Sequence, residues 1–293
     1  MTSSRTIMPV PTLPSELHKV IIDHVSDDWL DSDSEWDSED EDLSSGLTPL
    51  QSCTLVCRSW SNYALRRLFA TIQIPGFRPK EEEHARWESL LQLMEVNPNI
   101  GRSIRTLAVA LLPIVPTEDS FYNDRTLEKI LQRSTHVVEL HIQNIPDDFL
   151  ARPSIVNGLV CVLQCPSLHT ITIYSNTFRT SLFDSTSSIK SLRLVDVSNI
   201  IVDHKPSTSL ATLQKLDVYR SRVVMKTMHI LPKFRALFDH IQDFHMYDEV
   251  DCKAFRPWDS RMDLTKLTSL TLVVSGIHRT VYSLRSRVQL ISF

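Results

Sequence analysis

The most regular feature of the chain after residue 100 is a recurring arrangement of apolar positions. An apolar residue is followed by two variable residues and then by an apolar, a variable and an apolar residue. The last three positions are typical of a short β-strand, because side chains alternate between the two faces of a strand. The pattern occurs seven times, as Ile104/Leu107/Val109, Val137/Leu140/Ile142, Leu168/Ile171/Ile173, Ile189/Leu192/Leu194, Leu213/Leu216/Val218, Ile241/Phe244/Met246 and Leu267/Leu270/Leu272.

The repetition predicts that these strands lie side by side. One unit cannot hide its apolar residues alone, so neighbouring units are expected to stack into a parallel sheet with helices or turns behind it. Successive units start 33, 31, 21, 24, 28 and 26 residues apart, and four of these spacings fall in the range of leucine-rich repeats. Helical patterns at 84–96, 126–134 and 155–164 fit before and between the first strands.

We therefore predict an α/β fold in which residues 76–293 form an irregular leucine-rich-repeat-like solenoid with a parallel sheet. Only Asn176 stands where such repeats usually carry asparagine. The alternative is a generic α/β domain whose strands carry alternating leucines, and it too implies a parallel sheet.

The variable positions of the strands are expected to line the other, solvated face of this sheet. Polar residues and three tyrosines in nearby units are typical of a protein-binding surface, although a solvated sheet face can have the same composition. Within this set, His141, Tyr174, Arg193, Tyr219 and Tyr247 are the candidate cargo-binding residues. The full set is Thr106, Ala108, Glu139, His141, Gln143, Thr170, Thr172, Tyr174, Ser191, Arg193, Lys215, Asp217, Tyr219, Asp243, His245, Tyr247, Ser269 and Thr271.

The N-terminal part of the chain has helical rather than strand periodicity. Apolar residues recur at helical spacing between residues 12 and 25, at Leu13, Leu17, Val20, Ile21 and Val25. A second helical region begins at residues 48–51, Thr-Pro-Leu-Gln, which has the form of a capping box with proline at the first helical position. One of its apolar faces holds Leu50, Cys53, Cys57, Trp60 and Ala64. The other holds Leu55, Val56, Leu68 and Phe69. Helices with this much apolar surface must bury the excess against a neighbour or a partner.

A strongly acidic run separates the two helical regions. Ten of the sixteen residues from Asp27 to Asp42 are Asp or Glu, so the segment repels itself and buries little. We expect a disordered insert over 27–47. Ser32, Ser34 and Ser38 have acidic residues downstream and are candidate phosphorylation sites, which would add negative charge. The alternative is that the segment only solubilises the protein.

The N-terminal residues together resemble the F-box, especially the F-box-like proteins of mushroom-forming fungi. The resemblance rests on the Leu13-Pro14 start, the core from Leu55 to Trp60 and the closing Leu68-Phe69. It implies a three-helix module within residues 1–75 that binds a Skp-type adaptor and, through it, a cullin scaffold. The residues that would build or face the adaptor contact are Leu13, Pro14, Leu17, Ile21, Val56, Trp60 and Leu68. The acidic insert departs from the family, which joins its first two helices with a few residues. On the alternative interpretation the module is only a helical cap on the repeat domain.

Composition and charge narrow the possible partners and compartments. The chain is 42% hydrophobic and 23% charged, like an ordinary soluble globular protein, and it has no long apolar run to cross a membrane. Its N-terminus lacks the apolar core of a secretory signal, and its five cysteines form no disulfide framework, so we expect a cytoplasmic or nuclear protein. Residues 1–75 hold 5 Lys/Arg against 12 Asp/Glu, a net charge of −7, which disfavours a nucleic-acid-binding module there.

The sequence has no recognisable catalytic or metal-binding motif. GxSxG, GxxxxGK[ST] and HExxH are all absent. Cys161, Cys165 and His169 form the one tempting cluster, but apolar neighbours favour buried cysteines over a zinc site, and the same applies to Cys53 and Cys57. The absence of these motifs favours a non-catalytic protein without a cofactor, and the resemblance to the F-box implies that it is a substrate-recognition adaptor of a ubiquitin ligase with an unknown protein cargo. The alternatives are a leucine-rich-repeat scaffold with no ubiquitin role, or a hydrolase or transferase whose site the motifs miss.

Overall fold

The computed structural model divides the chain into two compact units, Met1–Ala70 and Thr71–Phe293. The residues that it describes are 15–30, 48–74, 81–110, 118–144, 153–175, 177–179, 186, 189–201, 213–221, 240–248, 267–274 and 288–291. Within these ranges, no helix has the length and apolar composition needed to cross a membrane.

The first unit contains three helices: α1 (Ser15–Leu30), α2 (Pro49–Thr54) and α3 (Arg58–Leu68). The predicted capping box at the start of α2 is confirmed. The Gln51 N–H donates to Thr48 Oγ1 at 3.3 Å, and the Thr48 N–H donates to Gln51 Oε1 at 2.8 Å, with Pro49 at the start of the helix. These bonds satisfy backbone donors that the first helical turn leaves without partners.

Two boundaries in this unit differ from the sequence prediction. Helix α1 continues to Leu30, so the first four residues of the segment 27–47 are helical rather than part of a loop. Residues 55–57 interrupt the second helical region, and Cys57 has the extended backbone of an N-cap (φ −162°, ψ 169°). Because of this break Cys57 is exposed, and its predicted place on a buried apolar face is wrong.

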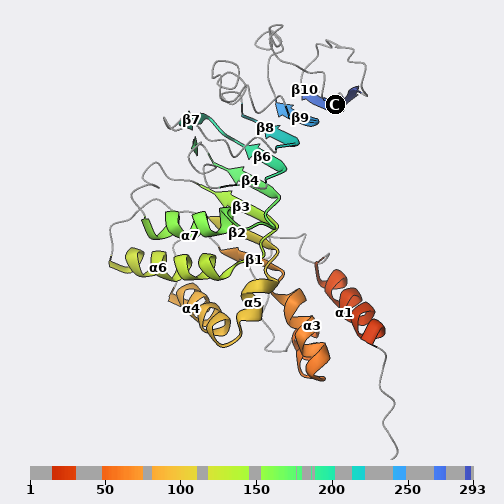
Figure 1. Cartoon of the computed structure of the whole chain (residues 1–293), viewed down its shortest axis with the longest axis vertical. Helices are drawn as coiled ribbons and strands as arrows, with labels where there is room; N and C mark the ends of the chain where they lie inside the picture. Colours follow the sequence, from red (N-terminus) through yellow and green to blue (C-terminus); the bar gives the residue numbers. More distant parts are fainter. Residues whose placement is uncertain are drawn as a thin grey trace, which may run out of the picture. The chain divides into compact units, whose positions relative to one another are not determined.

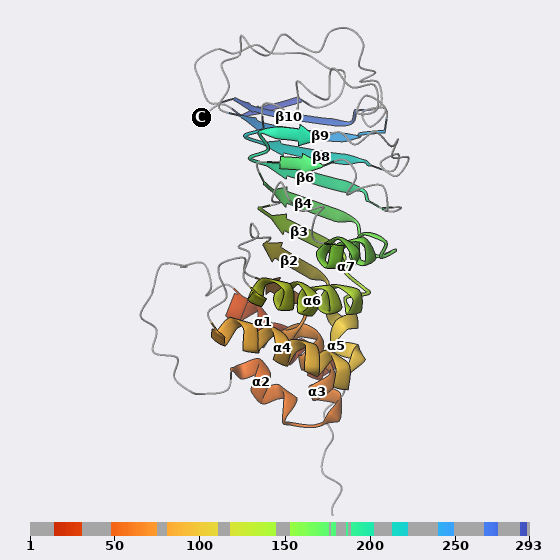
Figure 2. The same cartoon turned by 90° about the vertical axis from the view of Figure 1, so that its left-hand side faces the viewer.

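The second unit is built on a parallel sheet. The described strands of this sheet run in chain order, with every neighbouring pair parallel. Figure 2 shows them stacked one after another from β2 to β10. The nine strands are β1 (Thr71–Ile74), β2 (Thr106–Ala110), β3 (Glu139–Gln143), β4 (Thr170–Tyr174), β6 (Ser191–Val195), β8 (Lys215–Tyr219), β9 (Asp243–Asp248), β10 (Ser269–Val274) and β11 (Val288–Ile291).

The strand register joins the positions that the sequence pattern makes equivalent. Leu107 pairs with Leu140, Leu140 with Ile171, and the same column continues through the equivalent residues to Leu270. Both apolar positions of each triplet are buried in every strand from β2 to β9. The prediction of an α/β fold with a parallel sheet is thus confirmed, and each predicted triplet lies on a strand of that sheet.

The unit begins five residues before the predicted boundary. Strand β1, which the sequence analysis did not predict, pairs with β2 so that Ile72 lies opposite Leu107 and Ile74 opposite Val109. Ile74 is buried. Residues 71–75 were assigned to the helical module, but strand β1 belongs to the sheet.

Helices lie on one side of the first strands. They are α4 (Glu81–Val96), α5 (Pro98–Ser103), α6 (Glu118–Arg133) and α7 (Pro153–Leu163). Figure 1 shows α6 and α7 together beside β2, β3 and β4, and α6 packs against both α4 and α7. The helical patterns at 84–96, 126–134 and 155–164 correspond to α4, α6 and α7. A small second parallel sheet, β5 (Thr177–Arg179) with β7 (Asn199–Ile201), was not predicted.

A turn with a left-handed residue follows three of the strands. Asn144, Asp196 and Arg220 come directly after β3, β6 and β8, with φ angles of 54°, 58° and 45°. Each donates its N–H to the carbonyl at the end of the next strand, Tyr174, Tyr219 or Tyr247, at 2.8 to 3.0 Å. The same turn geometry at equivalent positions keeps successive strands in one register.

Candidate binding surfaces

The three-helix unit has a small core of its own. Ile22 of α1 and Ala64 of α3 are fully buried, and Leu50 and Cys53 of α2 join them. Trp60, Tyr63 and Leu68 of α3 are partly buried and pack against this cluster. All three helices therefore contribute to one core.

Several apolar side chains of the same unit are left in water. On α1, Leu17, Val20 and Ile21 are 46%, 61% and 39% exposed, and between α2 and α3 Leu55 and Val56 are 74% and 60% exposed. The unit has already buried other apolar residues of the same helices, so these are surplus to its core. Exposed apolar side chains in this number on so small a unit are typical of a binding surface.

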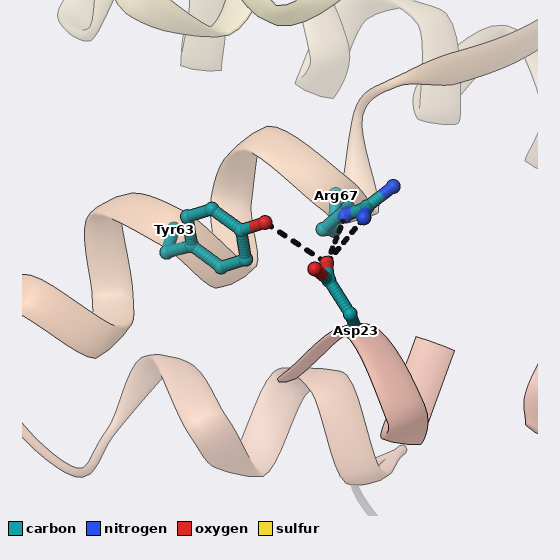
Figure 3. Close-up of polar contacts among 3 residues, drawn as sticks. All are labelled: Asp23, Tyr63 and Arg67. Atoms are coloured by element: carbon teal, nitrogen blue, oxygen red, sulfur yellow. Dashed lines mark hydrogen bonds and ion pairs between the residues drawn. The ribbon is translucent and has the colours of Figure 1, made fainter. Parts of the chain in front are cut away.

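A polar cluster ties α1 to α3. Asp23 Oδ1 accepts hydrogen bonds from the Tyr63 hydroxyl at 2.9 Å and from Arg67 Nε at 2.7 Å, and it also contacts Arg67 Nη2 (Figure 3). Partial burial acts to raise the pKa of Asp23, but the bonds from Arg67 and Tyr63 outweigh it and hold this pKa below its usual value. Burial and the Asp23 carboxylate raise the pKa of the Tyr63 phenol. His18 of α1 also lies against Trp60, with ring centroids 5.3 Å apart.

The predicted adaptor-binding residues divide into two groups. Leu17, Ile21 and Val56 are exposed, whereas Trp60 and Leu68 are partly buried against the core. Leu13, Pro14 and the candidate phosphorylation sites Ser32, Ser34 and Ser38 lie outside the described residues. Val20 and Leu55 are not among the predicted adaptor-binding residues, although both are more exposed than Ile21.

In the second unit, the candidate cargo-binding residues share the face of the sheet opposite the apolar triplets. The register aligns them in two columns. Ala108, His141, Thr172, Arg193, Asp217, His245 and Thr271 form the central column, and Ala110, Gln143, Tyr174, Val195, Tyr219, Tyr247 and Val273 form the column at the carboxyl ends of the strands.

The centre of this face holds a buried carboxylate between two cations. Asp217 Oδ2 accepts hydrogen bonds from Arg193 Nε at 3.3 Å and Nη2 at 3.2 Å, and Lys215 Nζ lies 3.6 Å away. The Asp217 side chain is only 3% exposed, while those of Arg193 and Lys215 are each 40% exposed. Asp217 Oδ1 is buried and has no hydrogen-bond partner among the described residues.

Aromatic rings extend from this cluster in both directions along the sheet. The Arg193 guanidinium lies over the Tyr219 ring, 5.5 Å from its centroid, and Tyr219 stacks on Tyr247 with centroids 4.3 Å apart. His141 stacks on Tyr174 at 6.5 Å. Burial lowers the pKa of His141. The Glu139 carboxylate opposes this shift and the Arg193 cation adds to it, so the net shift of this pKa is downward. The five selected residues thus form two contacting groups on one face.

Three residues expected to be solvated on this face are instead buried. Thr172, Asp217 and Thr271 are 1%, 2% and 8% exposed. For Thr172 and Asp217 the reason is the length of their neighbours. Thr172 lies in register between His141 and Arg193, and Asp217 between Arg193 and His245, so longer side chains cover both. The alternation of side chains along a strand predicts on which face of the sheet a side chain lies. It does not predict whether neighbouring side chains shield that residue from water.

The cysteine cluster behind the sheet is only partly as predicted. Cys165 is buried, and burial raises the pKa of its thiol, but Cys161 is exposed, so its predicted burial is wrong. Cys161 lies on the outward side of α7, whose Leu159, Val162 and Leu163 face inward. In the part of the chain that the structure describes, no three His, Cys, Asp or Glu residues are grouped so as to hold a metal ion.

Comparison with known proteins found no family model, no curated protein and no solved structure that matches the chain.

Proposed function

We propose that this protein is a substrate receptor of the F-box type, in which the three-helix unit docks on a Skp-type adaptor and the sheet face holds a protein cargo. A cullin-based ubiquitin ligase, in the cytoplasm or nucleus, would then act on the bound cargo. The protein contributes proximity and no catalytic residue to ubiquitin transfer. The chain's resemblance to the F-box, from Leu55 to Trp60 above all, suggests this partner.

The observation that carries the proposal is the excess apolar surface of the three-helix unit. Ile22, Leu50, Cys53 and Ala64 already close its core, yet Leu17, Val20, Ile21, Leu55 and Val56 remain exposed. Because the core of the unit is already closed without these side chains, they remain as apolar surface that a partner can cover, which supports docking on a separate protein.

A leucine-rich-repeat-like solenoid is the proposed architecture of the second unit. It is supported by seven triplets that recur in chain order, by the register that aligns them, and by the left-handed turn that recurs after β3, β6 and β8. In such architectures the sheet face opposite the helices is an extended binding surface. This supports the assignment of the cargo to the face that carries Arg193, Tyr219 and Tyr247.

The test is capture of the adaptor by the full chain. The double variant Leu17→Asp, Val56→Asp places charge on two exposed apolar positions, and we expect it to abolish co-purification with a Skp-type adaptor while the unit stays folded, as checked by circular dichroism. Trp60 is avoided because it packs on the core. The matched control is Val96→Asp on α4, which is 86% exposed and lies in the other unit. Unchanged adaptor capture by the double variant contradicts the proposal.

A second candidate is a repeat scaffold without any role in ubiquitin transfer. The observation that favours it is the long connection between α1, which ends at Leu30, and α2, which begins at Pro49, where the F-box family has only a few residues. If the wild-type chain captures no Skp-type adaptor but still retains a protein through the sheet face, the scaffold is the correct interpretation.

A further inference from the structure

We propose that the outer face of β6, β8 and β9 recognises an acidic, carboxylate-bearing segment of a protein partner. Arg193 would bind the carboxylate, and Asp217 would act as the positioning residue that holds Arg193 in place. This inference rests on the proposed role of the sheet face as the cargo surface and narrows it to one class of cargo.

The exposed charges of the cluster decide which kind of partner it attracts. Asp217 carries the one negative charge of the cluster, but its side chain is 3% exposed, whereas Arg193 and Lys215 are both 40% exposed. The side chains that Arg193 and Lys215 present to a partner are therefore cationic, because the carboxylate that they share is buried. Such a surface attracts an anionic group and repels a basic one.

Asp243 limits where this positive potential lies. It pairs in register with Lys215, and its Oδ1 accepts a hydrogen bond from the Thr268 hydroxyl at 3.1 Å. Its carboxylate reduces the positive potential on the Lys215 side of the cluster. With Asp243 counted, the two cations and two carboxylates carry no net charge. The local positive potential is therefore at Arg193, whose carboxylate partner Asp217 is buried, and this residue is the one assigned to the ligand.

A second feature of the cluster is the geometry of Arg193. A guanidinium has five N–H donors, and the described bonds of Arg193 use Nε and Nη2, both on Asp217 Oδ2. Its Nη1 end remains available for a carboxylate, which Arg can bind with two parallel hydrogen bonds. Asp217 below and the Tyr219 ring beside it fix the plane of the guanidinium before a ligand arrives. A side chain ordered in advance loses less entropy when it binds.

The stacked tyrosines lie beside the position proposed for the partner's carboxylate. Tyr219 and Tyr247 are parallel, with ring planes only 2° apart, both are partly exposed, and Tyr219 is the ring in contact with Arg193. Because Arg193 and Tyr247 lie against Tyr219 from the strands on either side, this ring offers its edge, and not a face, to neighbouring residues of a peptide. A cationic site beside aromatic rings could also take a single-stranded nucleic acid, so the experiment includes that ligand.

The test is selection of peptides on the full chain. An unbiased library of short displayed peptides is selected on the wild-type protein, and binding of the enriched peptides is measured by fluorescence anisotropy. We expect Asp or Glu to be enriched, and we expect Arg193→Gln to weaken binding about tenfold or more, the scale of a charge-assisted hydrogen bond. Replacing the acidic residue of the peptide by its amide should weaken binding by a similar factor.

Two further variants separate recognition from folding. Arg193→Lys keeps a charge next to buried Asp217, so it should fold, but it loses the two parallel hydrogen bonds and should also bind more weakly. Arg133→Gln is the matched control, because Arg133 is an arginine of similar exposure that pairs with Glu95 at 3.0 Å away from the sheet face. It should bind the peptides as the wild type does.

Three outcomes overturn the inference: no enrichment of Asp or Glu, binding that is unchanged in both Arg193 variants, or competition by an oligothymidylate as effective as that by the acidic peptide. Adaptor capture is measured on the same variants and should not change. Loss of acidic specificity with intact adaptor capture therefore removes only this inference, whereas loss of adaptor capture in the wild type removes the proposed function.

Discussion

Asp23 in the first unit and Asp217 in the second are each held by an arginine side chain, but they differ in their exposure to water. Asp23 is 26% exposed and accepts bonds from Tyr63 and Arg67, so it joins α1 to α3 near the surface. Asp217 is 3% exposed and depends on Arg193 and Lys215. A partly exposed pair contributes little to stability, whereas removing one partner of a buried pair leaves an uncompensated charge. The loss of Asp23 should therefore lower stability modestly and leave the unit folded, so its contribution can be measured, whereas variants of Arg193 need their fold checked before binding is measured.

We predict that Asp23→Asn destabilises the three-helix unit in a pH-dependent way. Because the folded pKa of Asp23 lies below its unfolded value near 3.8, the carboxylate stabilises the fold fully above that value, and this contribution disappears as pH falls through the folded pKa. The free energy of unfolding of the variant should be about 1 kcal/mol lower near neutral pH. This is the contribution of a charged hydrogen bond, reduced because the pair is partly exposed. Thermal unfolding of both proteins across this acidic range measures the difference.

Glu16→Gln serves as the control for this titration, since Glu16 is an exposed residue on the same helix. It should lower the unfolding temperature little at any pH. A deficit of Asp23→Asn that is the same at acidic and neutral pH would contradict the assigned role of the carboxylate.

At the scale of elements, the helices behind the sheet approach one another closely at two glycines. A Cβ at Gly158 of α7 would lie 3.1 Å from the Glu128 Cα and 2.9 Å from a methyl group of Leu131, both on α6. At Gly101 of α5 a Cβ would collide with the main-chain carbonyl of Arg133, at the end of α6. These glycines let neighbouring backbones approach closely, which supports the layer of helices that covers the first strands.

We predict that Gly101→Ala destabilises the second unit by about 1–3 kcal/mol, the usual cost of overpacking. Alanine favours a helix over glycine by about 1 kcal/mol, but the obstructing atom belongs to the backbone and cannot rotate away, so the clash outweighs this gain. The unfolding temperature should fall by about 2–4 °C for each kcal/mol. Differential scanning calorimetry measures the unfolding temperature. The control is Arg102→Ala, a change at the neighbouring exposed residue. A Gly101→Ala protein as stable as the wild type would show that the helices can move apart.

At the scale of the whole molecule, the division of the chain after Ala70 makes β1 the first strand of the sheet. Its removal would leave the backbone donors and acceptors of β2 without their partners on that side and would expose apolar Leu107 and Val109. An uncovered strand edge of this kind is prone to pair with other chains.

This leads to a prediction about fragments. A fragment of residues 71–293 is expected to fold and remain monomeric, whereas one of residues 76–293, which lacks β1, should aggregate or unfold at a lower temperature. Size-exclusion chromatography with light scattering and thermal unfolding by circular dichroism compare the two. Equal behaviour of both fragments would mean that β1 adds little to the sheet.

The local pattern of the sequence was sufficient for seven strands of the sheet and for their order. The triplet that ends in Leu107 and Val109, and its six successors, each lie on a strand, because the alternation of side chains is a property of the strand itself. The capping box at Thr48 was predictable for the same reason, since its partners are three residues apart. Strands β1 and β11 were not predicted, because Thr71–Ile74 and Val288–Ile291 are short and carry no triplet.

The candidate sites were predictable only in part, because burial depends on residues that are distant in the sequence. Periodicity could not decide whether Ile21 or Ile22 faces the core, and contacts with α2 and α3 place Ile22 inside. Alternation placed Asp217 on the polar face, but its burial depends on Arg193, one strand away and 24 residues earlier. The sequence by itself thus determined the seven strands that carry a triplet, their order and the faces of their sheet, whereas the tertiary structure decided which polar and apolar side chains remain in contact with water. The physical reason is that backbone geometry fixes the direction of a side chain, while its exposure is fixed by the size and charge of whatever packs beside it.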